Sequence, residues 1–159
     1  MIFITLGSQK FQFDRLLKAV DGLIERGIIQ EEVFAQTGYS TYVPKNYDYK
    51  AFLDRKIFLS MEEKADIIIT HGGTGAIVSA VKKGKKVIAV PRLAKYKEHV
   101  DNHQLQIVKQ FDDMNLICNC MNCDDLENAI EEVKARKYSS YTSNTQSILA
   151  SIEKFIEGN

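Results

Sequence analysis

Residues 71–75, with the sequence HGGTG, place one histidine, three glycines and one threonine directly after an apolar run. Glycines let a bulky anion approach the main chain, and a helix that begins here offers unpaired N–H groups and about half a unit of positive charge. This chemistry suits a phosphate, to which Thr74 can add a hydroxyl donor. The alternative is that the glycines only make a tight turn, because the segment matches neither the P-loop nor the G-x-G-x-x-G fingerprint.

A second polar cluster follows the next apolar run, KVIAV. Pro91 ends that run and opens the segment PRLAKYKEHVDNHQ. Groups that both donate and accept hydrogen bonds, close to a phosphate-type turn, suit a ligand rich in hydroxyls. The alternative is a solvated loop whose Asp or Asn caps the next helix. The side chains concerned are Arg92, Glu98, His99, Asp101, Asn102, His103 and Gln104.

The elements that must position these residues alternate between strand and helix. Apolar, β-favouring runs predict strands over residues 2–5, 31–38, 66–70, 86–90 and 116–120. Helical spacing predicts helices over residues 13–24, 76–84, 100–111, 124–135 and 145–156. Continuous apolar strands in this order predict an α/β fold, with a Rossmann-like parallel sheet covered by helices on both faces. The ends of strands 66–70 and 86–90 then bring both polar segments to one edge.

Two local signals refine the middle of the chain. Ser60, with Glu63 three residues later, predicts a capping box at a helix start. The aromatic stretch over residues 39–50 predicts a loop, with a short strand near Ala51.

Composition narrows the classes of function. The 159 residues suffice for one domain, and 21 basic and 21 acidic residues give a formal net charge of zero, which argues against nucleic acid as the main partner. The sequence has no apolar run of the roughly 20 residues that span a bilayer and no secretory signal, and its 3 cysteines do not form a disulfide framework. A reducing cytoplasm is therefore expected. Cys118, Cys120 and Cys123 lack a fourth ligand nearby, so no zinc site is expected.

The segment THGGTGAIVSAVKKGKKVIAVPRLAKYKEHVDNHQ resembles the nucleotide-sugar half of the glycosyltransferase family 28 C-terminal domain. It is most similar to small stand-alone members: the PssE-type subunits of bacterial exopolysaccharide and capsule synthesis, and the catalytic subunit of the two-part N-glycan N-acetylglucosaminyltransferase. IFITLGSQKFQFDRLL and FAQTGYSTYVP extend the resemblance over about residues 1–111. It implies the C-terminal, donor-binding half of a GT-B glycosyltransferase, with residues 1–159 as a single nucleotide-sugar-binding domain.

The resemblance also implies a donor site. The glycine turn would hold the diphosphate, Gln104 with His103 and Asn102 would contact the donor sugar, and the end of the first strand would face the same cleft. One position departs from the family, because Ser79 stands where relatives often have a ribose-binding glutamate. The residues expected to bind donor are Gly7, Ser8, His71, Gly72, Gly73, Thr74, Gly75, Arg92, Glu98, Asn102, His103 and Gln104.

The reaction that the resemblance implies is direct displacement with inversion at the anomeric carbon. Oriented N–H dipoles would stabilise the UDP leaving group, and no metal or other cofactor is expected, because the chain contains no D-x-D. A general base must take the proton of the acceptor hydroxyl. Glu98, His99 and His103 are candidates by type, and a partner chain could supply the base instead.

The chain is about half as long as a complete two-domain GT-B enzyme. The resemblance therefore implies a separate, membrane-anchored, PssD-like subunit that binds a lipid-linked sugar acceptor, with this chain docked to it at the cytoplasmic face of the membrane. A predicted last helix over residues 145–157 is a candidate docking element, or packs on its own domain. Galactose is the sugar that the PssE resemblance favours; N-acetylglucosamine or glucose would fit the same loop. The alternative function is a non-catalytic module that binds a nucleotide sugar or activates a partner.

Overall fold

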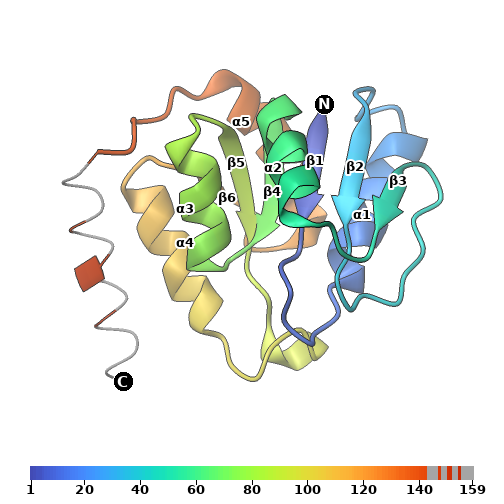
Figure 1. Cartoon of the computed structure of the whole chain (residues 1–159), viewed down its shortest axis with the longest axis horizontal. Helices are drawn as coiled ribbons and strands as arrows, with labels where there is room; N and C mark the ends of the chain where they lie inside the picture. Colours follow the sequence, from blue (N-terminus) through green and yellow to red (C-terminus); the bar gives the residue numbers. More distant parts are fainter. Residues whose placement is uncertain (143–146, 148–149, 152–153, 155–159) are drawn as a thin grey trace.

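The computed structural model describes residues 1–142, 147, 150–151 and 154 (Figure 1). The apolar residues of the helix predicted over 145–157 lie outside the described residues. The elements are β1 (Ile2–Thr5), α1 (Asp14–Glu25), β2 (Val33–Gln36), β3 (Asp48–Lys50), α2 (Arg55–Lys64), β4 (Ile67–His71), α3 (Thr74–Lys82), β5 (Lys86–Val90), η1 (Ala94–Tyr96), α4 (His103–Asp113), β6 (Cys118–Asn119), η2 (Cys123–Asp125) and α5 (Leu126–Ala135).

The strands form one six-stranded sheet in the order β3-β2-β1-β4-β5-β6, and every neighbouring pair is parallel. The chain starts at β1, adds β2 and β3 on one side, and returns to add β4, β5 and β6 on the other. The order therefore reverses between β1 and β4, so the loops that follow these two strands diverge. The Rossmann-like parallel sheet predicted from the alternating pattern is confirmed.

Helices cover both faces of the sheet, and each face has its own apolar core. Phe3 and Ile68 point to the face covered by α2, α3 and α4, whereas Ile4 and Ile69 point to the face covered by α1 and α5. All four side chains are fully buried. Figure 1 shows α2, α3 and α4 together on the near side of the sheet. Burial of successive residues on opposite faces explains why the strands read as continuous apolar runs.

Two predicted helix starts were wrong. Helix α2 begins at Arg55, because the carboxylate of Asp54 accepts a hydrogen bond from the Ile57 N–H at 2.9 Å; Ser60 lies inside the helix and caps nothing. Helix α4 begins at His103, three residues after the predicted start. The two residues before it are held in the loop, because Asp101 accepts the N–H of His103 at 3.0 Å and the side chain of Asn102 accepts the N–H of Ala94 at 2.9 Å. The short strand expected near residue 51 is β3.

Two carboxylates of α1 hold the irregular connection between β2 and β3. Asp14 accepts hydrogen bonds from the Thr41 hydroxyl at 2.6 Å and from two main-chain N–H groups. Asp21 is buried and accepts from the Tyr42 hydroxyl at 2.6 Å and from the N–H of Lys45 at 2.9 Å. Burial alone would raise the pKa of Asp21, but these hydrogen bonds outweigh it and lower that pKa. A long loop is thereby fixed beside the carboxyl edge of the sheet.

Among the helices formed by the described residues, none has the length and apolar content needed to cross a bilayer.

Candidate functional site

The glycine turn lies at the point where the strand order reverses. His71 is the last residue of β4, and Gly7 follows the end of the neighbouring β1 by two positions. In open α/β sheets, ligands bind at the carboxyl ends of the strands beside such a reversal. The two loops expected from the sequence to face one cleft are therefore adjacent in the fold.

The main chain packs against the imidazole of His71 from both loops. A Cβ added to Gly7 would lie 2.7 Å from His71 Nε2, and one added to Gly73 would overlap His71 Cε1. Gly7 also has a φ of +71°, which favours glycine. Gly72 is constrained from the other side, since an added Cβ would lie 2.8 Å from atoms of Gln104 and Val108. These three glycines are therefore required by packing.

Gly75 is different from these glycines. It is exposed, and a Cβ added there would meet no atom within 4 Å. It lies in the first turn of α3, whose N-cap residue, Gly73, makes no side-chain hydrogen bond to the helix. The first N–H groups of a helix have no partner within it, and they carry the positive end of the helix dipole. This turn therefore presents main-chain donors beside open space, as an anion site requires.

Gln104 connects the ends of β4 and β5. Its side chain is buried, and its Oε1 accepts hydrogen bonds from the N–H of Gly72 and from the N–H of Arg92, each at 3.0 Å. Its Nε2 lies 3.4 Å from His71 Nδ1. The side chain expected to contact the donor sugar thus uses its oxygen to fix the main chain, and only its amide nitrogen has hydrogens left for a ligand.

Arg92 is fully enclosed beneath the site. Its Nη2 donates to the carbonyl of Leu6 at 2.6 Å, and its Nη1 donates to the carbonyls of Phe11, Gln12 and Glu98. Burial lowers the pKa of Arg92 to about 10, so the guanidinium is still charged at neutral pH. The side chain binds together the loops after β1 and β5, and its Nη groups point at carbonyls rather than at a ligand.

Glu98 is also inside the protein. Its two carboxylate oxygens each lie 3.0 Å from a nitrogen of the Arg15 guanidinium, and Oε1 also accepts the N–H of Leu93. Glu98 is fully buried, whereas Arg15 is partly exposed and lies over the Tyr96 ring. The carboxylate would have to leave Arg15 before it could meet a sugar or accept a proton. Sequence reasoning gave Arg15 no role; a buried carboxylate needs a cation, but the sequence does not indicate which one.

The loop before α4 contains a second polar group. Asp101 accepts the N–H of His103 at 3.0 Å and lies 3.2 Å from His99 Nδ1. The pKa of Asp101 is lowered, first by that hydrogen bond from His103 and then by the two neighbouring imidazoles. The N–H of Asp101 also donates to His99 Nδ1 at 3.4 Å, so the contacts with Asp101 orient the imidazole through Nδ1. His99 also packs against the ring of Phe11, with 5.3 Å between ring centroids.

The remaining predicted residues occupy the rim. Ser8 and His103 are exposed, and Thr74 is half-buried in the first turn of α3. Asn102 accepts the N–H of Ala94 at 2.9 Å, so its carboxamide oxygen stabilises the loop. Among the residues that the structure describes, no group of three or more His, Cys, Asp or Glu side chains is placed to hold a metal ion.

Ser79, which departs from the family pattern, lies beside a carboxylate of another helix. Its hydroxyl donates to Glu62 of α2 at 3.0 Å. Glu62 is buried and forms an ion pair with Lys83 at 2.9 Å. The carboxylate missing from position 79 in the sequence is therefore present next to it in space, where it is neutralised by a lysine.

A parallel α/β sheet with a glycine-rich turn at the point where its strand order reverses defines a Rossmann-like class of fold. Residues 1–158 match the glycosyltransferase family 28 C-terminal domain, and the chain belongs to that family. The family resemblance inferred from the glycine turn and the PRLAKYKEHVDNHQ segment is confirmed.

Curated relatives are UDP-N-acetylglucosamine transferase subunits. The human subunit ALG13 is 30% identical over 118 residues, which cover 69% of this chain and 10% of the relative. The Candida albicans subunit is 32% identical over 79 residues, which cover 50% of this chain and 25% of the relative. This chain therefore spans a tenth to a quarter of these relatives.

Solved structures share the fold at low sequence identity. An NMR structure of ALG13 aligns with a TM-score of 0.60 at 19% identity, covering 98% of this chain and 94% of that one. MurG from Acinetobacter baumannii aligns with a TM-score of 0.56 at 19% identity, covering 95% and 49%. The kitacinnamycin glycosyltransferase aligns with a TM-score of 0.61 at 15% identity, covering 99% and 39%. The GT-B donor-domain fold expected from the sequence is confirmed.

The hydrogen bonds of Gln104 predict that replacing this residue destabilises the fold, which the loss of a ligand contact alone would not do. Replacing it by leucine leaves the buried N–H groups of Gly72 and Arg92 without an acceptor, at about 1–3 kcal/mol each. We expect Gln104→Leu to lower the free energy of unfolding, measured in urea, by about 2–4 kcal/mol. Gln106→Leu, at an exposed position of the same helix, is the control. Equal stability of the two variants would contradict the assigned role of the oxygen.

His71 predicts a pH dependence of stability. Burial, followed by the charges of Arg92 and His99, lowers the pKa of His71 from 6.5 to about 3. Between these pH values His71 is protonated in the unfolded chain but not in the folded chain. The free energy of unfolding therefore keeps its full value above pH 6.5 and decreases as the pH falls towards 3. Relative to His71→Asn, the wild type should lose stability over this window in urea unfolding. If the free energy of unfolding of the two proteins changed with pH in the same way, His71 would not be protected from protonation.

Proposed function

We propose that this chain is the donor-binding, catalytic subunit of a two-part UDP-sugar-dependent glycosyltransferase. In this role it binds the UDP-sugar and transfers the sugar, with inversion, to an acceptor held by a partner. The new bond joins the acceptor oxygen to the anomeric carbon, the bond to the diphosphate breaks, and UDP leaves with the electron pair. Membership of the glycosyltransferase family supports transferase activity, and the site supports the donor side of the reaction.

The observation that carries the proposal is the open first turn of α3. UDP leaves as a diphosphate, and main-chain N–H groups already oriented towards it stabilise the charge that grows during bond breaking. Gly75 leaves room for the diphosphate to reach these groups. The neutral imidazole of His71 closes the inner side of the turn without adding a negative charge. Residues 71–75 with Gly7 and Ser8 are therefore the proposed diphosphate site, and Gln104, His103 and Asn102 form the proposed sugar side.

A partner is proposed because exposed apolar side chains follow the carboxyl ends of three strands. Tyr39 and Phe52 follow β2 and β3, are about half exposed, and pack edge to face at 5.2 Å between centroids. Tyr96 and Val100 follow β5 and are also exposed. All four residues come after the carboxyl ends of strands, the edge that the second half of a GT-B enzyme would face. We propose a membrane-anchored, acceptor-binding subunit as that half, at the cytoplasmic membrane face, with residues 145–157 as a further docking element.

The identity of the sugar is proposed only as a UDP-hexose. The named relatives favour N-acetylglucosamine, whereas the resemblance of the PRLAKYKEHVDNHQ segment to PssE-type subunits favours galactose on a lipid-linked capsule or exopolysaccharide precursor. Calorimetry with UDP first tests nucleotide binding. The affinities for UDP-N-acetylglucosamine and UDP-galactose, measured in the same way, then distinguish the two sugars.

Gly75→Ala tests the proposed diphosphate site. The added methyl group meets no protein atom, so we expect the free energy of unfolding to stay equal or to rise by up to about 1 kcal/mol. The methyl group narrows the space before the helix N–H groups, so affinity for UDP, measured by calorimetry, should fall about tenfold, or about 1.4 kcal/mol. Gly22→Ala, also in a helix with no neighbour within 4 Å, is the matched control. Wild-type UDP affinity in Gly75→Ala would place the diphosphate elsewhere.

Of the three candidate bases, we propose His99 as the proton acceptor. Glu98 is enclosed with Arg15, whereas His99 is oriented through Nδ1 by Asp101. We expect His99→Gln to lower the transfer rate about 10²–10⁴-fold with the partner present, while UDP affinity is kept, because only proton transfer is lost. Lys109→Gln, at an exposed position of α4 outside the site, is the control.

An unchanged rate in His99→Gln would assign the base to the partner. Donor binding without any transfer in the presence of the partner would support the alternative, a non-catalytic module.

A further inference from the structure

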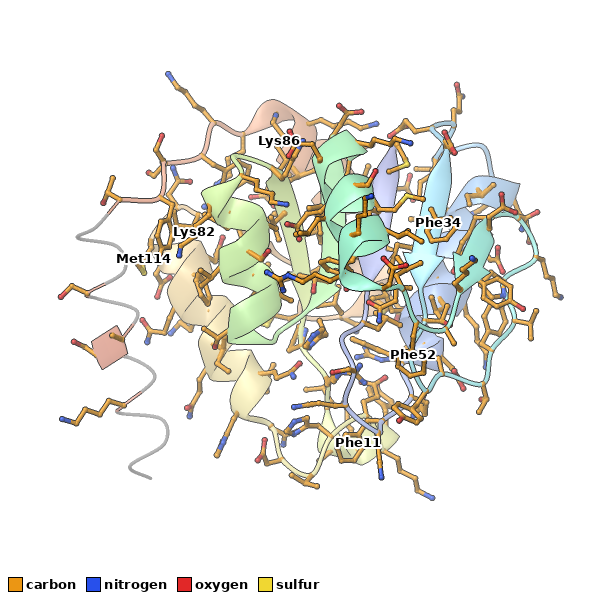
Figure 2. The ribbon with its side chains drawn as sticks, in the orientation of Figure 1. Phe11, Phe34, Phe52, Lys82, Lys86 and Met114 are labelled. Carbon is orange, nitrogen blue, oxygen red and sulfur yellow. The ribbon has the colours of Figure 1, made fainter. Side chains whose placement is uncertain are left out.

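A cavity lies at the edge of the sheet opposite to the glycine turn. It has a volume of about 520 Å³ and is formed by the end of α3, the start of β5, the end of α5 and the segment that follows α5. Figure 2 shows Lys82 and Lys86, which line it, far from Phe11 at the other edge. Five basic side chains and no acidic side chain line the cavity: Lys82, Lys85, Lys86, Arg136 and Lys137.

Within the part of the chain that the structure describes, carboxylates pair with only one of these five basic groups. Arg136 pairs with Asp112 at 2.9 Å and with Glu132 at 3.2 Å. Lys85 and Lys86 donate to the main-chain carbonyls of Glu63 and Lys134, which position the ammonium groups without cancelling their charge. Among the ion pairs of the described residues, none joins the four lysines of the cavity to a carboxylate.

Sources of negative charge lie close to these lysines. The carboxylate near Lys85 is that of Asp66, which is bound to the N-terminal ammonium at 2.7 Å. Helices α3 and α5 both end at the cavity, and each C-terminus contributes about half a negative charge. The two helix ends and the second carboxylate paired with Arg136 together supply about two negative charges against four ammonium groups. The cavity therefore keeps a positive potential in a chain whose formal net charge is zero.

One wall of the cavity is ordered by hydrogen bonds. Asn115 accepts the Nε–H of Arg136 at 2.9 Å and donates to the carbonyl of Lys137 at 3.1 Å and to the hydroxyl of Ser139 at 3.3 Å. Ser139 and Ser140, which both line the cavity, are exposed. The ammonium of Lys82 lies 5.3 Å from the centroid of the Tyr141 ring, which lines the cavity as well. Hydroxyl donors are thereby held among the lysines.

We propose that this cavity binds a phosphate group, carried either by a soluble phosphate ester or by the headgroup of an anionic lipid. Ammonium groups together with hydroxyl donors match the oxygens of a phosphate, and the volume lies within the range of about 300–1,000 Å³ of small-ligand sites. The five residues of β5 separate the cavity from the glycine turn by roughly 13 Å, at about 3.3 Å per residue. The phosphate bound here is therefore not the diphosphate of the sugar donor.

Amide shifts of the ¹⁵N-labelled full chain, titrated with inorganic pyrophosphate, test the proposal site by site. Shifts over residues 82–86 and 137–141 report on the cavity, whereas shifts over residues 72–76 report on the glycine turn, so the two sites succeed or fail separately. Sedimentation with phosphatidylglycerol vesicles, compared with phosphatidylcholine vesicles, tests the lipid source. The pocket variant is Lys82→Gln/Lys137→Gln, at two exposed lysines. The control, Lys56→Gln/Lys109→Gln, removes the same charge from exposed positions elsewhere.

A soluble phosphate predicts saturable shifts at the cavity that become at least fivefold weaker in affinity in the pocket variant and are unchanged in the control. A lipid headgroup predicts sedimentation with phosphatidylglycerol vesicles alone, lost in the pocket variant and kept in the control. Either result supports the proposal and identifies the source. Absence of both responses, or equal loss in the two variants, overturns it, because the lysines would then act only through the total charge.

Discussion

The site depends on one buried guanidinium. Arg92 donates to four main-chain carbonyls from the loops after β1 and β5, and with neighbouring Glu98 and Arg15 it fixes both loops against α1. An apolar side chain of similar size would fill the space but leave these carbonyls without donors, and each buried carbonyl would then cost about 1–3 kcal/mol. Since these hydrogen bonds join groups of the protein itself, they hold the loops without any contact to a ligand.

This arrangement separates the residues that build the site from the groups that face a ligand. The large polar side chains of the site, Arg92, Glu98 and Gln104, are buried and bind main-chain atoms of the protein. The groups left facing open space are the N–H groups of the first turn of α3, with Gly75 beside them. Main-chain donors cannot change rotamer, so an anion bound there needs little reorganisation of the site. The polar side chains therefore supply rigidity, and the main chain supplies charge.

The fold was predictable because a parallel sheet buries both faces of its strands. Strands of this kind consist of consecutive apolar residues, as in the runs IFIT and KVIAV. The place of the glycine turn followed from the order of elements. The roles of Arg92, Glu98 and Gln104 did not follow, because a sequence shows which groups can form hydrogen bonds and not whether the fold already satisfies them. Arg15 was missed for the same reason. The capping box at Ser60 failed because Asp54, six residues earlier, provides a competing cap that fits the end of β3.

The net charge of the sequence likewise does not show where the charges lie in the fold. A formal net charge of zero excludes a uniformly basic surface, but it does not describe how 21 basic and 21 acidic residues are distributed. Carboxylates such as Asp14, Asp21 and Glu98 are used internally, where they accept hydrogen bonds from loops and from Arg15. Carboxylates that are bound elsewhere in the protein do not neutralise the lysines around the start of β5. A neutral chain can therefore keep a positive cavity at one edge of its sheet and a positive helix end at the other.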